Sequence, residues 1–283
     1  MKKAPLFLLL LLMITTIGCS NDDSSDIEEY FEYQYDNNNV EITNWEAVKN
    51  GDRFVIRGVG NEQGFAIEFN KYGHLSSANS YSTSNFSFPL SQSYIYYSSH
   101  SFNFNLIDVD TDNHTVKASF DGLLYEDNYD INSPTHQVSG EFNLKYAETP
   151  ETELSSLHCK FDNQDWYSTN MDSSSSGSNV EVSFFNDDEY IINFYYDENT
   201  ISTCNNCAFT ANSNLRMQLN IYDPVNDEMI ECNSTGTLSI TNYTPSSGFN
   251  NGLIEGDFNF TATNPNNNQT YHIDNGHFKL ILQ

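Results

Sequence analysis

The closest pair of cysteines has the most recognisable chemical spacing in the chain. Cys204 and Cys207 enclose two asparagines, and Cys159 and Cys232 are the other cysteines of the C-terminal half. A thioredoxin-like redox pair needs a βαβ context, and a zinc site needs a second pair at similar spacing. The sequence offers neither. We therefore favour structural disulfides, up to two among these four thiols, with three connectivities open.

A series of aspartates suggests a cation site. Asp108, Asp110 and Asp112 place carboxylates at alternate positions, a spacing that suits Ca²⁺. An EF-hand loop would continue with glycine at its sixth position and glutamate at its twelfth, where this chain has Asn113 and Ser119. Asp and Asn are also the residues expected in a turn between strands. Calcium binding by the three aspartates and a plain turn both stay open, and no other cofactor or metal is indicated.

Adjacent carboxylates raise the question of hydrolysis. Asp187, Asp188 and Glu189 follow one another, as do Glu126 and Asp127, and a glycosidase dyad could be hidden among such residues. We favour the plainer interpretation that they are solvated loop residues that keep a surface sheet soluble. The chain has no zincin helix, serine elbow, P-loop or dinucleotide fingerprint, and its seven histidines are scattered. We expect no catalytic residue and no enzyme, with an envelope hydrolase using an Asp/Glu pair as the alternative.

Aromatic residues are the remaining lead. Exposed tyrosine or tryptophan on a sheet face can stack on sugar rings, whereas alternation would direct about half of such rings into a core. The candidates are Tyr94, Tyr96 and Tyr97 in the first half, Tyr195 and Tyr196 in the second, and Trp45 and Trp166.

Charge excludes several partners. The 283 residues include 39 Asp and Glu but only 11 Lys and Arg, which gives a formal net charge of −28. Binding to nucleic acid requires cationic side chains that neutralise phosphates, and docking on anionic lipid requires a basic surface. We therefore expect no nucleic-acid partner. Because 38% of the residues are hydrophobic and 14% aromatic, the composition predicts folded domains rather than disorder.

The N-terminus carries the marks of export. Lys2 and Lys3 precede an apolar run over 6–17, which is too short to span a membrane and suits a secretory signal. The run ends in Thr-Ile-Gly-Cys at 16–19, which resembles a bacterial lipobox. The resemblance implies that residues 1–18 are removed and that acylated Cys19 anchors the protein in a membrane. An ordinary secretion signal is the alternative.

An acidic, flexible tether is expected over residues 19–29. Its Ser-Asn-Asp-Asp-Ser-Ser-Asp sequence resembles the segment behind the lipidated cysteine of Bacteroidota lipoproteins, where it is associated with export to the cell surface. The resemblance implies an outer-membrane lipoprotein that faces the exterior. A spacer without an export role is the alternative.

The rest of the chain reads as two copies of one module. FEYQYDNNNV at 31–40 matches LHCKFDNQDW at 157–166, an offset of 126 residues. Further matched segments follow in the same order. The later pairs are separated by a larger offset than the earlier ones, which predicts an insertion in the second copy near Cys204–Cys207 or residues 224–233. These segments are 55–59 with 180–184 and 65–69 with 190–194 at an offset of 125, 116–120 with 254–258, and 138–144 with 273–280.

Apolar and polar residues alternate with a period of two within each copy, as in 102–106 and 215–221, and Asn, Asp, Gly and Pro cluster between the alternating segments. We predict an all-β fold of two tandem antiparallel β-sandwich-like or open-barrel domains. The first domain covers 30–147 and the second 156–283. A polar linker over 148–155 would keep the domains close and hinged.

Gly-x-Phe sequences that end strands at 140–142, 256–258 and 276–278 resemble those of a class of surface lipoproteins from Bacteroidota, as does the strand-turn-Trp segment at 161–166. The resemblance implies fold and location but carries no catalytic residue. The function expected from the sequence is a surface-exposed, lipid-anchored binding or adhesion protein for carbohydrate or a protein ligand. An accessory structural lipoprotein is a further alternative.

Overall fold

The computed structural model describes residues 28–152, 154–246 and 251–282. These residues form strands and two short 3₁₀ turns, with no α-helix among them, which confirms the all-β prediction. Within these ranges, no helix has the length and apolar character needed to cross a membrane. Cys19, the signal segment and most of the tether lie outside the described residues, so their assignments stay predictions.

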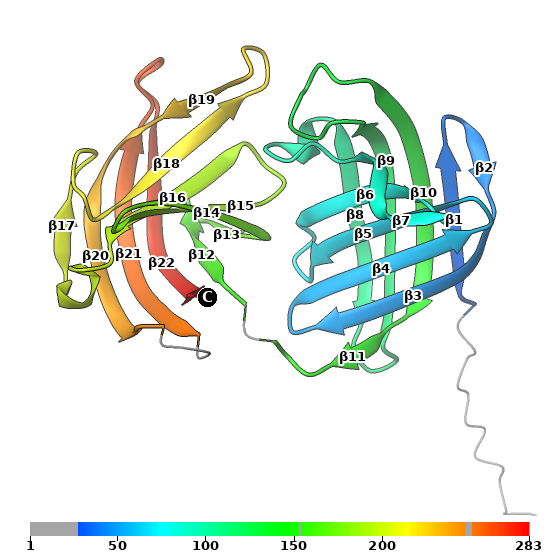
Figure 1. Ribbon diagram of the computed structural model, residues 1–283, viewed down its shortest axis with the longest axis horizontal. Helices are drawn as coiled ribbons and strands as arrows, with labels where there is room; N and C mark the ends of the chain where they lie inside the picture. The colour runs from blue at the N-terminus through cyan, green and yellow to red at the C-terminus, as the bar shows by residue number, and fades with distance from the viewer. Residues whose placement is uncertain (1–27, 153, 247–250, 283) are drawn as a thin grey trace, which may run out of the picture.

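The first domain contains strands β1 to β11. They are β1 (Tyr30–Tyr35), β2 (Asn38–Val40), β3 (Ile42–Asn50), β4 (Arg53–Gly60), β5 (Gln63–Asn70), β6 (Leu75–Ser82), β7 (Asn85–Gln92), β8 (Phe102–Asp110), β9 (Thr115–Tyr125), β10 (Thr135–Lys145) and β11 (Ala147–Thr149), with a 3₁₀ turn η1 at Ser98–His100. One layer has the order β3-β4-β5-β6-β7 and the other β2-β1-β10-β9-β8. A pairing of Gln92 with Tyr125 joins them at one corner. In Figure 1 the strands β3 to β6 run across β8 to β10, as in a sandwich of crossed layers.

The second domain contains strands β12 to β22. They are β12 (Ser156–Phe161), β13 (Gln164–Tyr167), β14 (Asn170–Ser176), β15 (Asn179–Phe185), β16 (Tyr190–Asp197), β17 (Cys207–Phe209), β18 (Arg216–Asp223), β19 (Glu228–Glu231), β20 (Asn233–Thr244), β21 (Gly252–Thr263) and β22 (Thr270–Leu282), with a 3₁₀ turn η2 at Ile201–Thr203. Its layers have the orders β14-β15-β16-β18-β19 and β13-β12-β22-β21-β20-β17. Apart from β17, this repeats the order of the first domain strand for strand, so the structure shows the same module twice.

The first turn of each module depends on the same residue types. Asp36 and Asn37 have φ of 48° and 62°, and Asp162 and Asn163 have φ of 46° and 70°. Asp and Asn tolerate this left-handed conformation, which a two-residue hairpin between twisted strands requires. The Asp-Asn pair recognised in both repeats therefore specifies the β1–β2 and β12–β13 hairpins.

The repeat register differs from the predicted one in two strands. For β5 and β16 the difference is two residues: Asn70 pairs with Arg53 and Asp197 with the equivalent Asn179, so equivalent residues lie 127 apart, and the predicted offset of 125 for 65–69 is wrong. For β4 and β15 the difference is one residue. Asn50 and Arg53 close the β3–β4 hairpin, and Ser176 and Asn179 close β14–β15, so equivalent residues lie 126 apart. The predicted offset of 125 for 55–59 is wrong, because it would match buried Ile56 with a position on the opposite face. The insertion lies near Cys204–Cys207, the first of the two predicted positions. Only residues 71–74 connect β5 to β6, whereas 198–215 connect β16 to β18 and carry β17.

The two cores fill equivalent positions with different side chains. In the first domain the ring of Phe31 lies against Gly58, where an added Cβ would come within 2.5 Å of Phe31 Cε1. The equivalent residues of the second domain are Leu157 and Phe184, both buried in its core. The large ring therefore comes from β1 in one module and from β15 in the other.

The linker is bonded to both domains. Strand β11 pairs in parallel with β3, and the Asn50 side chain accepts a hydrogen bond from the Thr152 backbone N–H at 3.0 Å. At the other end, Ser155 Oγ accepts a hydrogen bond from the Ile281 N–H at 2.9 Å. These contacts tie down a segment that the sequence suggested would act as a hinge.

Candidate binding groove

A groove of about 650 Å³ lies on the outer face of the β3–β7 layer. Cross-strand pairing sets its first row of side chains, because residues paired directly across antiparallel strands share a face. This row runs from Glu46 on β3 through Arg57, Ala66 and Asn79 to Gln92 on β7. The small side chain of Ala66 at the centre leaves room between longer polar side chains on either side. We call this feature the outer-face groove.

A second row supplies an apolar floor. Val59 pairs with Gly64, Gly64 with Tyr81, and Tyr81 with Pro89. A Cβ at Gly64 would lie 2.5 Å from Tyr81 Cζ, so the glycine lets the tyrosine ring approach the sheet. The Tyr81 hydroxyl donates a hydrogen bond of 2.9 Å to the Gly58 carbonyl, which fixes the ring. The floor is therefore rigid and largely apolar.

Polar groups surround this floor. Gln92 Nε2 donates a hydrogen bond of 2.6 Å to Asn79 Oδ1, an arrangement that orients both amides. Glu46 and Arg57 are paired across β3 and β4 and supply one charge of each sign. Trp45 is 38% exposed at the β3 edge of the groove.

The groove continues to the boundary between the domains. A second hollow of about 290 Å³ is lined by Asn79 and Gln92 as well, and adds Asp172 from β14 and Tyr129 from the β9–β10 connection. The Tyr129 side chain is 62% exposed. The two hollows share the amides of Asn79 and Gln92, and the exposed ring of Tyr129 lies beside the second hollow. Together they form one continuous polar groove that residues of both domains line.

Hydrogen bonds from Thr169 and from Asn170, at the start of β14, to β6 hold the two sides of this polar groove together. Thr169 Oγ1 donates to the Leu75 carbonyl at 3.0 Å, and Asn170 Nδ2 donates to the Ser76 carbonyl at 2.9 Å. Ser76 Oγ donates in return to Asn170 Oδ1 at 2.7 Å. These pairings align the end of the first domain's layer with the edge strand of the second.

Tyrosines form a second contact between the domains. Tyr94 and Tyr125 from the first domain pack with Tyr222 from the second, and all three are buried. The Tyr222 hydroxyl lies 2.6 Å from that of Tyr94 and donates to Asp227 Oδ1 at 2.8 Å. Burial raises the pKa of Tyr222 well above its ordinary value, with the hydrogen bonds to its neighbours adding to the effect. Such a cluster stabilises the neutral hydroxyls and the relative placement of the domains.

The acidic stretch 187–189 serves the same interface. Asp187 Oδ1 lies 3.1 Å from His74 Nδ1 of the first domain. Asp188 accepts hydrogen bonds of 2.9 Å from the indole N–H of Trp166 and the backbone N–H of Tyr190. Burial raises the pKa of Asp188 to about 7. Neither aspartate lines the outer-face groove.

The other acidic candidates occupy turns. Asp110 accepts backbone hydrogen bonds from Asp112 and Asn113 at 2.9 and 3.0 Å, so it closes the β8–β9 turn. Hydrogen bonds from Asn113 hold the Asp110 pKa below its usual value. Within 28–152, 154–246 and 251–282, no three His, Cys, Asp or Glu side chains form a group that could hold a metal. Calcium binding by Asp108, Asp110 and Asp112 stays a prediction.

Glu126 and Asp127 have turn roles too. Glu126 Oε1 lies 3.4 Å from His136 Nε2, and Asp127 accepts a hydrogen bond of 3.0 Å from the Tyr129 backbone N–H. The second contact holds the turn that presents the Tyr129 ring.

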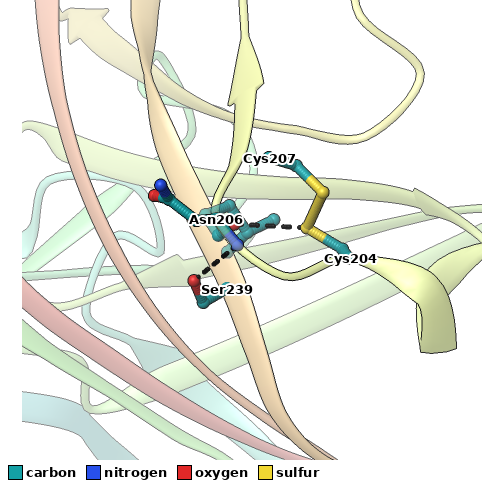
Figure 2. The surroundings of a disulfide bond; sticks show 5 residues. Cys204, Asn206, Cys207 and Ser239 are labelled. Carbon is teal, nitrogen blue, oxygen red and sulfur yellow. Dashed lines mark hydrogen bonds between the residues drawn. A yellow bond between two sulfur atoms is a disulfide. The ribbon is translucent and has the colours of Figure 1, made fainter.

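One disulfide joins Cys204 to Cys207 in the inserted connection of the second domain (Figure 2). Figure 2 also shows the Asn206 N–H between them donating to Ser239 Oγ, at 2.8 Å, which attaches the loop to β20. The structural-disulfide prediction is confirmed for this pair. It is wrong for Cys159 and Cys232, which are buried free thiols, and burial raises their pKa values to about 12 and about 11.

The predicted aromatic candidates divide between core and surface. Tyr94, Tyr196 and Trp166 are buried, whereas Trp45 is 38% exposed and its indole N–H donates a hydrogen bond to Glu29 Oε2. Sequence reasoning did not identify Asn79, Tyr81, Gln92 or Tyr129, which line the two hollows.

No protein-family model, curated protein or solved structure matches the chain.

Proposed function

We propose that this protein is a surface-exposed, lipid-anchored binding protein whose outer-face groove recognises carbohydrate. The observation that carries the proposal is the combination of a rigid apolar floor at Tyr81 and Ala66 with the paired amides of Asn79 and Gln92. Sugar rings have apolar faces that pack on such a floor and hydroxyl groups that bond to amides. The lipobox-like segment ending at Cys19 would hold this groove at the cell surface.

The content of carboxylates favours binding over hydrolysis. Among the described residues that line it, Glu46 is the one carboxylate of the outer-face groove, and Asp172 is the one carboxylate of the adjoining hollow. A glycosidase needs an acid and a second carboxylate on either side of one bond. Glu46 lies opposite Arg57 instead, where it would serve as a hydrogen-bond acceptor for ligand hydroxyls.

Continuity of the groove favours a chain of sugars over a monosaccharide. The amides of Asn79 and Gln92 line both hollows, and the exposed ring of Tyr129 stands beside the second one. A polymer could therefore occupy successive positions from β3 to β14, with stacking on the ring adding on the order of 1 kcal/mol.

A glycan array followed by calorimetry tests this function. We expect the protein from residue 20 onward to bind an oligosaccharide, and the double variant Asn79→Ala and Gln92→Ala to weaken binding about tenfold, as expected for one or two lost hydrogen bonds. Asn242→Ala is the matched control, since this exposed amide bonds Glu255 on the other layer of the second domain. Absence of any hit on the array would refute the proposal.

A further inference from the structure

The outer edge of the β3–β7 layer is covered by a strand. Strand β11 adds to β3 in parallel, with Ala147 opposite Val48 and Thr149 opposite Asn50. The Asn50 amide donates a hydrogen bond of 2.9 Å to Thr149 Oγ1. An extended segment of a few residues is thus sufficient to complete this edge of the module.

The equivalent edge of the second domain is open. Strand β14 replaces β3 in the strand order, and Ser174, Ser175 and Ser176 are equivalent to the three residues that bind β11. Among the described residues, β15 is the sole partner of β14. All of β14 except Asn170 is exposed, and its serines leave the backbone accessible. Natural edges are usually blocked by lysine, proline or a covering segment; β14 contains neither lysine nor proline, and no described segment covers it.

A groove of about 350 Å³ lies directly beside these serines. Glu181, paired with Ser174, lines it and accepts a hydrogen bond of 2.7 Å from the Tyr195 hydroxyl. The Arg216 guanidinium also lines this groove, 3.6 Å from the Tyr195 ring centre, and its donors are engaged by Gln218 Oε1 and the Ser213 carbonyl.

Charge at this edge is negative. Asp172 lies two residues before Ser174 on the same face of β14, because strand residues two apart share a face. Glu181, which lines the groove, and Asp172, which lies beyond its lining on the same face, place two carboxylates next to unpaired backbone groups. The net charge of −28 for the whole chain adds attraction for a cationic partner.

We propose that β14 binds an extended peptide segment of a partner protein by strand addition, in the way that β11 binds β3. The segment carries Lys or Arg at alternate positions, which places the cations over Asp172 and Glu181 while its backbone pairs with 174–176. Main-chain hydrogen bonds provide affinity in this mode, and the alternate side chains provide selectivity. The groove beside the serines shares no lining residue with the outer-face groove, whereas Asp172 also lines the adjoining hollow.

Amide hydrogen exchange on the full chain from residue 20 onward tests this site. The probe is a short peptide of alternating Lys and Thr, and the matched control peptide alternates Glu and Thr. We expect the Lys-Thr peptide to slow exchange at 171–176 without changing β3, and the Glu-Thr peptide to have no effect. Binding that leaves exchange in β14 unchanged would show general electrostatic adhesion and overturn the proposal.

Two variants separate strand addition from charge attraction alone. The pair Ser176–Asn179 closes the hairpin, so the N–H of Ser175 lies on the open side of β14. Ser175→Pro removes this donor and should weaken the Lys-Thr peptide about tenfold, whereas Ser175→Thr keeps the donor and should bind normally. Equal binding by both variants overturns the proposal, as would sedimentation of the free protein as a dimer that β14 peptides dissociate.

Discussion

The first and second domains repeat one strand order but complete it with different residues. The first domain places its large ring on β1, as Phe31 against Gly58, whereas the second places it on β15 as Phe184. The first covers its edge strand with β11, whereas the second leaves β14 open and carries a disulfide-linked insertion. The shared strand order therefore requires a filled interior. Which strand supplies the large ring, and whether the edge strand is covered by another strand, can differ between the two domains.

The second domain should be the more sensitive of the two to truncation at the compared core position. Phe184 is fully buried, and Phe184→Ala would remove most of a ring from a packed interior. We expect a loss of about 3–5 kcal/mol in the free energy of unfolding. Chemical denaturation followed by tryptophan fluorescence measures it. Gly58→Ala at the equivalent position of the first domain is the comparison: its added Cβ meets the Phe31 ring, so we expect a smaller loss of about 1–3 kcal/mol. No loss at all would contradict the idea that Phe31 fills this volume.

A transfer of the ring should sharpen the same comparison. Gly58→Phe introduces a side chain where Cβ alone would meet Phe31, and overpacking of this kind costs about 1–3 kcal/mol. Combining it with Phe31→Leu reproduces the residues of the second domain. We expect the double variant to be more stable than Gly58→Phe alone, which a double-mutant cycle on melting temperature and unfolding free energy would establish. Additive losses would show that the two modules are not interchangeable at this site.

Dependence of stability on pH should be concentrated where the domains meet. The hydrogen bond from His74 to Asp187 raises the His74 pKa, and burial raises the Asp188 pKa to about 7. In both cases the folded protein binds a proton more tightly than the unfolded chain, so this contribution to stability falls as pH rises from about 5 to 8. The His74 part is fully present below its unfolded pKa of about 6.5 and is lost as pH passes its raised value.

Substitution should flatten this dependence by an amount on the order of 1 kcal/mol. His74→Gln and Asp188→Asn each remove one of the titrating groups, and melting curves between pH 5 and about 8 would follow the change. His277→Gln on β22 is the control, since His277 pairs with Asp257 inside one layer of the second domain. If stability depended more steeply on pH in the His74→Gln and Asp188→Asn variants than in the unmodified protein, these two residues would not be the source of the pH dependence.

Much of the fold could be predicted from the sequence, because alternation and turn residues are local signals. The Asp-Asn pairs at 36–37 and 162–163 specify hairpins by backbone conformation alone. The register of β15 was misjudged by one residue because apolar residues occupy both of its faces, as Phe184 and Phe185 do. Alternation assigns the faces of a strand clearly only when one of them is polar.

The candidate groove was beyond such reasoning because it depends on which strands lie side by side. Glu46, Arg57, Asn79 and Gln92 are widely separated in the chain and belong to ordinary polar positions of four strands. Their alignment follows from the registers of three hairpins and the β7 pairing, which no single segment encodes. Trp166 is the opposite case, because the sequence made it a candidate for a surface role. In the structure it is buried, and its indole N–H donates a hydrogen bond to Asp188.

Strand β1 determines how the first domain would respond to mechanical load. It is the first strand after the described N-terminus and pairs along its whole length with β10 in antiparallel orientation. A pull applied along β1 from residue 28 would shear six residue pairs at once instead of separating them one by one. Forced unfolding is limited by the rate at which such pairs break, so a shared load lengthens the lifetime of the fold.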